Sequence, residues 1–410
     1  MTDRSAVRRA RATAALLSLA AAGCVRSATP APALAGAPGA LPDSGAFVTL
    51  LGADTIAGGR FVRTARRVEA DVVLRVPTTL RTRYVLELDS AGNLARLESV
   101  TTDPQRAGGA TVRRQVLTRS AEWLHSDVAA GGQSDVRMVE APIATLPFID
   151  MVHWPYEIAL VHARASGGLP AALPLLTGAR VSRFPVAAVG TDSATITHPS
   201  RGTMRVRLDA RGRLLGLDAG QTTRKLRLAR RPWMSVDSSV ARWAALDAAG
   251  RGLGALSGRA EERQQLGDAT LVVDYGTPAK RGRAIWGALV RFGEVWRTGA
   301  NEATHLTTDR AIVLGAGADT LVVPAGRYTL FSIPARDGGM LIVNRQTGQG
   351  GTTYDAARDL GRVRLVARAL PAPVELFTIR VGSTGAASGE LRLQWDDTEL
   401  VVPVRVREGA

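Results

Sequence analysis

Polar and apolar residues alternate with a period of two along most of the chain after Phe47. This is the pattern of half-buried β-strands. The runs Val72–Val76 and Tyr84–Leu88 are clear examples, and a turn containing Asp89 and Gly92 follows the second run. Aspartate and glycine are residues that tight hairpin turns favour. The pattern therefore predicts a long antiparallel meander in the first half of the chain.

The same hairpin signature occurs a second time, at Leu208-Asp209-x-x-Gly212-x-Leu214. It is either an internal repeat or the product of convergence, because short hairpins favour Asp and Gly for steric reasons. Both interpretations predict two hairpins in one curved antiparallel sheet. By the shape of this pattern alone, the region is loosely similar to the curved sheets of periplasmic lipid-carrier proteins.

Two segments carry helical rather than strand periodicity. Residues 149–165 are predicted to form a helical insertion in the meander, with Pro155 near its start. Pro232 interrupts the last strand of the meander, and Asp237 can cap a second helix. The apolar face of this second helix is predicted to consist of Val240, Trp243 and Leu246.

The last third of the chain contains short, closely spaced strand patterns with no long helical pattern between them. This spacing predicts an antiparallel β-sandwich, similar to a jelly roll. The predicted strands are 270–275, 304–308, 311–314, 326–333, 340–344, 363–369, 374–381, 390–395 and 400–406. We expect the last two strands to form a hairpin across a turn at Asp396-Asp397-Thr398.

The fold class predicted for the whole chain is mainly β, with more than one domain. Its 410 residues exceed the roughly 250 to 300 residues at which a single core stops growing. Composition shifts divide the chain into predicted segments. They are a signal peptide (1–23), a flexible tether (24–45), a β-rich N-terminal domain (46–231), a helical and Gly-rich connector (232–267) and a C-terminal sandwich (268–406).

The first residues have the pattern of an export signal. Four arginines precede an apolar run at 14–22, which is too short to span a membrane. Cys24 follows Gly23 and is the only cysteine. It occupies the place of a lipidated cysteine, although ordinary cleavage within 31–35 remains open. We expect an exported envelope lipoprotein that is anchored to the membrane through Cys24 and has no disulfide within the chain.

The net charge of +15 and the pI near 11.2 raise the question of a nucleic-acid partner. However, the basic residues are spread along strand-like segments, and aromatic residues make up only 5% of the chain. Dense basic runs and stacking aromatics are what nucleic-acid binding needs. We therefore expect solvated arginine-rich strand faces and no nucleic-acid partner.

Several motifs cluster in the last third of the chain: Asp274-Tyr275-Gly276, Lys280-Arg281-Gly282-Arg283 and the run from Gly293 to Thr304, which contains Trp-Arg-Thr-Gly-Ala-Asn-Glu. Together with Asn344 and Tyr354-Asp355, they make residues 268–406 resemble the DUF2911 family, whose domains have no settled activity. The resemblance implies a β fold and an export context. It implies no catalytic residues.

The run around Gly299 concentrates polar side chains that can bind a ligand. Arg297 offers a planar fork for a carboxylate or phosphate, and Trp296 offers a face for a sugar ring or a cation. Asn301 has both a donor and an acceptor. A purely structural arrangement is the alternative, in which Arg297 pairs with Glu302 beneath a buried Trp296. The complete candidate ligand-binding set is Trp296, Arg297, Asn301, Glu302, His305, Asn344, Tyr354 and Asp355.

Catalysis is the less favoured interpretation. Glu302 and Asp355 can serve as an acid and a base, with His305 as a proton carrier, if the fold brings them together. The sequence has no Gly-x-Ser-x-Gly elbow and no phosphate-binding loop, and His153 and His162 lack a metal-ligand spacing. We therefore predict no cofactor or metal, and a non-catalytic protein that binds a glycan, a peptide, a partner protein or an apolar ligand. A carboxylate-based hydrolase is the alternative.

Overall fold

The computed structural model describes residues 43–165 and 167–407. The predicted signal peptide (1–23), Cys24 and most of the tether lie outside the described residues. None of the helices in the described part of the chain has the length and apolar character needed to cross a membrane.

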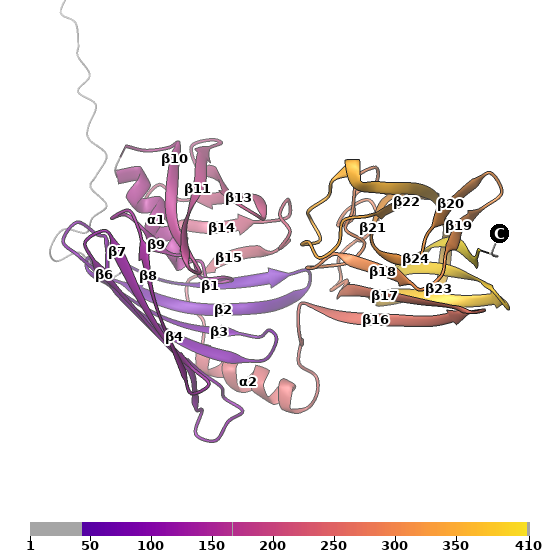
Figure 1. The fold of residues 1–410 in the computed structure, drawn as a ribbon. Coiled ribbons are helices and arrows are strands. Elements are labelled where there is room, and N and C mark those ends of the chain that lie inside the picture. The colour runs from indigo at the N-terminus through magenta and orange to yellow at the C-terminus, as the bar shows by residue number, and fades with distance from the viewer. Residues whose placement is uncertain (1–42, 166, 408–410) are drawn as a thin grey trace, which may run out of the picture. The chain divides into compact units, whose positions relative to one another are not determined.

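The first fifteen strands form one curved sheet, here called sheet A (Figure 1). Its strand order is β8-β7-β6-β5-β4-β3-β2-β1-β15-β14-β13-β12-β11-β10-β9. Neighbouring strands are antiparallel, except that β9 is parallel to β10. The strands are β1 (Asp43–Leu51), β2 (Asp54–Arg63), β3 (Arg67–Leu74), β4 (Leu80–Leu88), β5 (Leu94–Thr102), β6 (Thr111–Ser120), β7 (Trp123–Ala130), β8 (Gln133–Glu140), β9 (Leu146–Pro147), β10 (Ala171–Thr177), β11 (Arg180–Ala188), β12 (Ser193–His198), β13 (Gly202–Leu208), β14 (Leu214–Asp218) and β15 (Arg227–Arg231). The predicted curved antiparallel sheet is confirmed.

The two helices cover opposite faces of sheet A. Helix α1 (Trp154–Ala165) lies on the inner face of the curve, where Trp154 packs edge-on against Tyr84 of β4. Helix α2 (Val236–Ala248) packs Trp243 against Val73 on the other face. Both helices were expected, but α2 is capped by Ser235, two residues before the predicted Asp237. Ser235 is the better cap because its side chain accepts a hydrogen bond from the backbone N–H of Ser238.

The two predicted hairpins have the same turn chemistry. In the β4–β5 turn, Oδ1 of Asp89 accepts hydrogen bonds from the backbone N–H groups two and four residues later, at 2.9 and 2.8 Å. In the β13–β14 turn, Oδ1 of Asp209 does the same, at 2.9 and 2.9 Å. The recurrence in the sequence is therefore a recurrence in the structure.

Both turns also lie against the last part of α1. Gly92 and Gly212 have φ angles of 84° and 80°, which favour glycine. A Cβ atom on Gly92 would lie 2.9 Å from Nε2 of His162, and one on Gly212 would lie 3.2 Å from Cδ of Arg164. Glycine at these positions lets the turns pack closely on the helix.

The remaining nine strands form a second sheet, here called sheet B, in the order β16-β17-β18-β21-β22-β23-β24-β19-β20. The strands are β16 (Ser257–Leu266), β17 (Ala269–Pro278), β18 (Thr304–Thr308), β19 (Ile312–Ala316), β20 (Asp319–Val323), β21 (Gly326–Ala335), β22 (Gly338–Asn344), β23 (Asp359–Gly385) and β24 (Ser388–Val406).

Sheet B is continuous in its hydrogen bonds and folds over on itself around one core. The later part of β23 packs across from β17, where the Tyr275 hydroxyl donates to the Ile379 carbonyl, and Phe377 packs edge-on against Tyr275. The sandwich-like prediction is thus confirmed, with two layers that share the long strands β23 and β24.

The predicted hairpin at Asp396-Asp397-Thr398 is wrong. Residues 390–395 and 400–406 belong to one strand, β24, which pairs with β23 along its length. The pairing register breaks between Ala369 and Val374, opposite Asp396, which has a φ of 55°. The turn-favouring residues form an irregularity that bends both long strands.

Two strands were not predicted. Strand β16 occupies part of the segment interpreted as a connector, and β20 lies between two expected strands. Half-buried and exposed positions alternate along most of β16, but charged and amide side chains occupy both of its faces. Because β16 is an edge strand, polar side chains cost it little, and its sequence pattern is correspondingly weak.

Candidate functional site

Trp296 belongs mainly to the core of the C-terminal region. Its ring centroid lies 5.0 Å from Phe377 and 6.0 Å from Trp395, and its backbone pairs with Ser332 at 2.7 and 2.9 Å. A third ring, Trp286, lies 6.0 Å away. These contacts fix the indole between strands and leave it only partly exposed.

Arg297 and Glu302 do not pair with each other. Nε of Arg297 donates to the Gly299 carbonyl at 3.3 Å, and within the described ranges no carboxylate lies within ion-pair distance of its guanidinium. Burial lowers the pKa of Arg297. Glu302 is exposed, and its backbone forms a bridge with Gly350. The alternative in which Arg297 forms an ion pair with Glu302 is therefore wrong.

Asn301 acts through its backbone. Its φ angle of 61° places it in the left-handed region, which asparagine tolerates better than most residues. Its carbonyl accepts a hydrogen bond from the Gly351 N–H at 2.9 Å, while the residue itself is exposed. Asn301 therefore helps to hold one loop against another.

His305 and Asn344 are buried in sheet B. Nε2 of His305 accepts a hydrogen bond from the Gly348 N–H at 3.1 Å, and its Nδ1 has no partner among the described residues. Burial lowers the pKa of His305. The Asn344 amide donates to the Asp355 carbonyl and to Oδ1 of Asp359, both at 2.9 Å. Both side chains anchor the loop that follows β22.

Tyr354 and Asp355 order the same loop. The Tyr354 hydroxyl donates to Oδ2 of Asp359 at 2.8 Å and accepts from Arg362 at 2.9 Å. Burial and the bond to Asp359 raise the pKa of Tyr354. Asp355 caps the short 3-10 helix η1 (Ala356–Arg358) by accepting from the Ala357 N–H. Sequence reasoning missed the ion pair of Asp359 and Arg362, because residues three positions apart in a strand are not expected to meet.

No interaction joins Glu302 to Asp355, and Asp355 is committed to its cap. In the part of the chain that the structure describes, no group of three or more His, Cys, Asp and Glu side chains is placed to hold a metal ion. His153 and His162 have different surroundings: His162 packs on Gly92, whereas His153 lines a hollow in sheet A.

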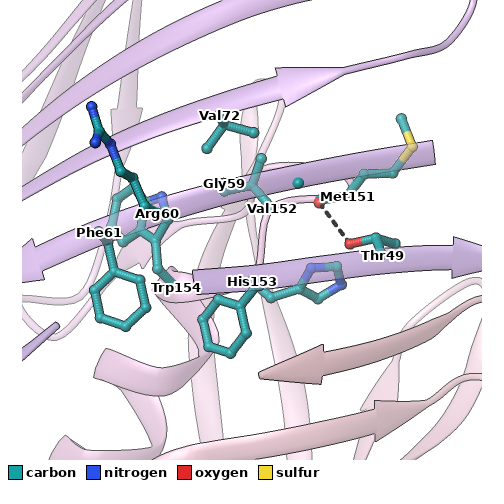
Figure 2. A pocket seen from close by; sticks show the side chains of 11 residues that line it. Thr49, Gly59, Arg60, Phe61, Val72, Met151, Val152, His153 and Trp154 are labelled. Carbon is teal, nitrogen blue, oxygen red and sulfur yellow. Dashed lines mark hydrogen bonds between the residues drawn. The ribbon is translucent and has the colours of Figure 1, made fainter. Parts of the chain in front are cut away.

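This hollow lies on the inner face of sheet A, between strands β1 to β3 and the segment that enters α1 (Figure 2). It encloses about 20 Å³, and most of its accessible wall is apolar. A volume of this size accepts one small polar group or a water molecule. Its lining is Phe47, Thr49, Gly58, Gly59, Arg60, Phe61, Val72, Met151, Val152, His153 and Trp154.

Among the described residues, two ring nitrogens in the wall of the hollow are buried without a hydrogen-bond partner. They are Nδ1 of His153 and Nε1 of Trp154, in side chains that are 5% and 3% exposed. A buried polar atom without a hydrogen bond costs about 1 to 3 kcal/mol. Burial lowers the pKa of His153 to about 4, so the imidazole is neutral at pH 7. The wall therefore contains two neutral ring nitrogens that can each form a hydrogen bond with a ligand group.

The segment that closes the hollow is strained. Met151 has a φ of 62°, which is unusual for a residue other than glycine or asparagine. Its carbonyl accepts a bond from the Thr49 hydroxyl at 3.5 Å (Figure 2). Asp150, directly before it, forms ion pairs with Arg201, at 2.7 Å, and with Arg224. The strain is held in place by these contacts on both sides.

A buried ion pair fixes α1 beside the hollow. Glu157 is 1% exposed, pairs with Arg230 of β15 and accepts from the Leu214 N–H at 2.8 Å. Burial raises the pKa of Glu157, and the Arg230 charge opposes that shift. The Arg230 guanidinium lies 5.5 and 5.3 Å from the ring centroids of Phe47 and Phe61. Sequence reasoning missed this pair because its members are far apart in the chain.

Comparison with known proteins identifies the C-terminal region. Residues 257–404 match the family described as "Protein of unknown function (DUF2911)". The predicted resemblance is confirmed, and the matched DUF2911 region begins at the first residue of β16. The N-terminal region is not part of this match.

Other comparisons add little. A solved structure of a DUF1089 family protein from Pseudomonas aeruginosa is 13% identical and covers 40% of this chain and 91% of that chain, with a TM-score of 0.29. At this TM-score the likeness carries no argument. A search of curated proteins gives no match.

Proposed function

We propose that this protein binds an amphipathic small molecule without catalysis, through the hollow in sheet A. The observation that carries the proposal is the pair of buried, unpartnered ring nitrogens of His153 and Trp154 in the wall of an apolar hollow. Natural proteins satisfy most buried polar groups, and here two groups without a partner among the described residues line the same hollow. A ligand group that enters the hollow supplies one.

The chemistry of the wall selects the ligand class. The Trp154 N–H is a donor, and His153 is neutral, so a neutral carbonyl fits better than a charged group. The stacked rings of Phe47 and Phe61, with centroids 5.4 Å apart, favour an apolar body next to that carbonyl. A fatty acyl ester or amide has both features. Only its carbonyl fits the present volume.

The test is a matched pair of Trp→Phe substitutions. Trp154 and Trp243 are 3% and 4% exposed, but only Trp154 lines the hollow. We expect Trp154→Phe to weaken binding of a dansyl-labelled fatty acid methyl ester about tenfold, because it removes one hydrogen bond. Trp243→Phe should leave the dissociation constant unchanged. Fluorescence titration measures both, and thermal unfolding confirms that each variant is folded.

Two results would contradict the proposal. One is an absence of ester binding by the unmodified protein. The other is equal weakening by both substitutions, because Trp243 packs on the opposite face of sheet A and does not touch the hollow.

We further propose that the protein acts in the cell envelope, anchored through a lipid on Cys24. The basic and apolar segments before Gly23-Cys24 support this. Metabolic labelling with a fatty-acid analogue should mark the protein and be lost in Cys24→Ala. Labelling that persists in the variant would exclude Cys24 as the anchor.

The carboxylate-based hydrolase is the weaker proposal. Glu302 is exposed without an ion-pair partner among the described residues, and Asp355 serves as a helix cap. Paired acid and base groups have to flank a common substrate position. The contacts of these two residues favour roles in loop structure instead.

A further inference from the structure

Strand β8 lies at one edge of sheet A. It pairs with β7 on one side, and among the described residues no strand pairs with its other side. Residues 133–138 are all exposed, whereas Val139 packs against the core. The opposite edge of the sheet is β9, which is only two residues long. A short edge strand is protected from further pairing. In β8, part of the strand lies close to β11, but the exposed residues 133–138 remain a template for another strand.

The outer face of β8 carries two large apolar side chains. Val136 and Met138 are 67% and 58% exposed, and Trp123 of β7, at 37%, lies on the same face. The inner face is identified by Leu124, which pairs in register with Val139 and packs against the core. Large apolar side chains on an unpaired edge strand indicate a surface that another molecule covers.

The charges on β8 specify its partner. Asp135 and Arg137 precede and follow Val136 in the sequence. Their side chains lie on the inner face, where they form an ion pair at 2.7 Å. Charged residues usually keep an edge strand unpaired. Here the order Asp-Val-Arg is self-complementary: in an antiparallel pair of two β8 strands centred on Val136, each Asp135 lies opposite Arg137 of the other copy. Twofold registers centred on Asp135 or on Arg137 place like charges opposite each other, which is unfavourable.

We propose that β8 is the homodimer interface of this protein. Two copies pair their β8 strands antiparallel about a twofold axis at Val136, so that sheet A continues from one copy into the other. The outer face then brings Val136 against its own counterpart and Ser134 opposite Met138. This pairing is isologous and uses up the free edge of both copies, so that assembly stops at two.

Charge reversal with rescue tests this register. In the full chain, R137D places two carboxylates opposite each other on both sides of the central Val136, and D135R does the same with two cations. Each single variant should raise the dimer dissociation constant about tenfold or more. The double variant D135R/R137D restores opposite charges and should dimerise like the unmodified chain. Analytical ultracentrifugation over a range of concentrations measures the constant.

The matched control is R205D, at an exposed arginine of β13 away from the edge. It should leave dimerisation unchanged. A chain that is monomeric at every concentration would overturn the proposal, as would a dimer that R137D leaves intact. So would a monomer that dimerises only after removal of residues 1–42, because that segment would then be the natural occupant of the edge.

Discussion

The run Gly293–Thr304 and the segment Ile149–Trp154 differ in how they use polar groups. Both contain non-glycine residues with positive φ, such as Thr298 at 50° and Met151 at 62°. In the first segment, the Thr298 hydroxyl bonds to Ser332 at 2.9 Å, and that of Thr304 bonds to the Thr298 carbonyl at 2.7 Å. In the second, ring nitrogens of His153 and Trp154 have no hydrogen-bond partner in the described part of the chain.

This difference separates the framework of a loop from a candidate binding place. A dense run of polar residues attracts attention in a sequence, but the side-chain hydrogen bonds that Arg297, Thr298 and Thr304 make here order the loop itself. A buried group without a partner is rarer and more costly. Such a group is therefore the stronger indication of a ligand, although no local sequence pattern predicts it.

The largest effect expected from this comparison is at Trp296. Trp296→Ala should destabilise the DUF2911 region by about 3 to 5 kcal/mol, because it opens a cavity among packed aromatic rings. Trp233→Ala is the matched control: Trp233 is 66% exposed, and the cost should stay below about 0.5 kcal/mol. Urea unfolding followed by circular dichroism measures both. Unchanged stability in Trp296→Ala would show that this indole is not a core residue and would favour a role in stacking against a ligand.

A medium effect is expected from pH at His153. The pKa of its imidazole is about 4 in the folded chain and ordinarily about 6.5 when unfolded. As the pH falls, the unfolded chain therefore binds this proton first, and the folded state loses about 1.4 kcal/mol per pH unit between 6.5 and 4. Below pH 4 this contribution levels off.

His153→Gln should remove that part of the pH dependence, and His125→Gln on β7 serves as the matched control. Unfolding free energies measured from pH 7 to pH 4 give the two slopes. If the slope of His153→Gln equals that of the unmodified chain, the imidazole is not buried in its neutral form, and the account of the hollow fails.

The smallest effect is expected at Glu302. Its side chain is exposed and forms no ion pair with the described residues. Glu302→Gln should change the unfolding free energy by less than about 0.5 kcal/mol. Chemical denaturation measures this. A loss of several kcal/mol would show that the carboxylate has a partner and would revive Glu302 as a site residue.

The sequence predicted much of the fold. Period-two alternation predicted an antiparallel sheet in the N-terminal half and located most strands of the C-terminal region, and the Asp-Gly turns at Asp89 and Asp209 located two hairpins. The expected helix at 149–165 contains α1. The same local reasoning failed at Asp396, where turn-favouring residues lie within a continuous strand. Turn residues indicate a local change of direction, and a bend in a strand needs the same residues as a hairpin.

The candidate site was predicted far less well. Trp296 and Asn344 were recognised as unusual, but their partners decide that they serve mainly in structure. His153 was considered only as a metal ligand, and Trp154 was not considered at all. Their significance depends on strands β1 to β3, which the chain brings against the start of α1 from a distant part of the sequence.

By itself, the sequence determined the β-rich class, the hairpin turns, the position of α1 and the DUF2911 resemblance, because these depend on patterns within a few residues of one another. Only the tertiary structure decided which polar atoms are satisfied, which strand is left at an edge and where sheet B folds over. Hydrogen bonds and ion pairs such as Glu157–Arg230 join residues 73 positions apart. Hydrogen-bond partners across such separations are properties of the packed chain, and no local pattern encodes them.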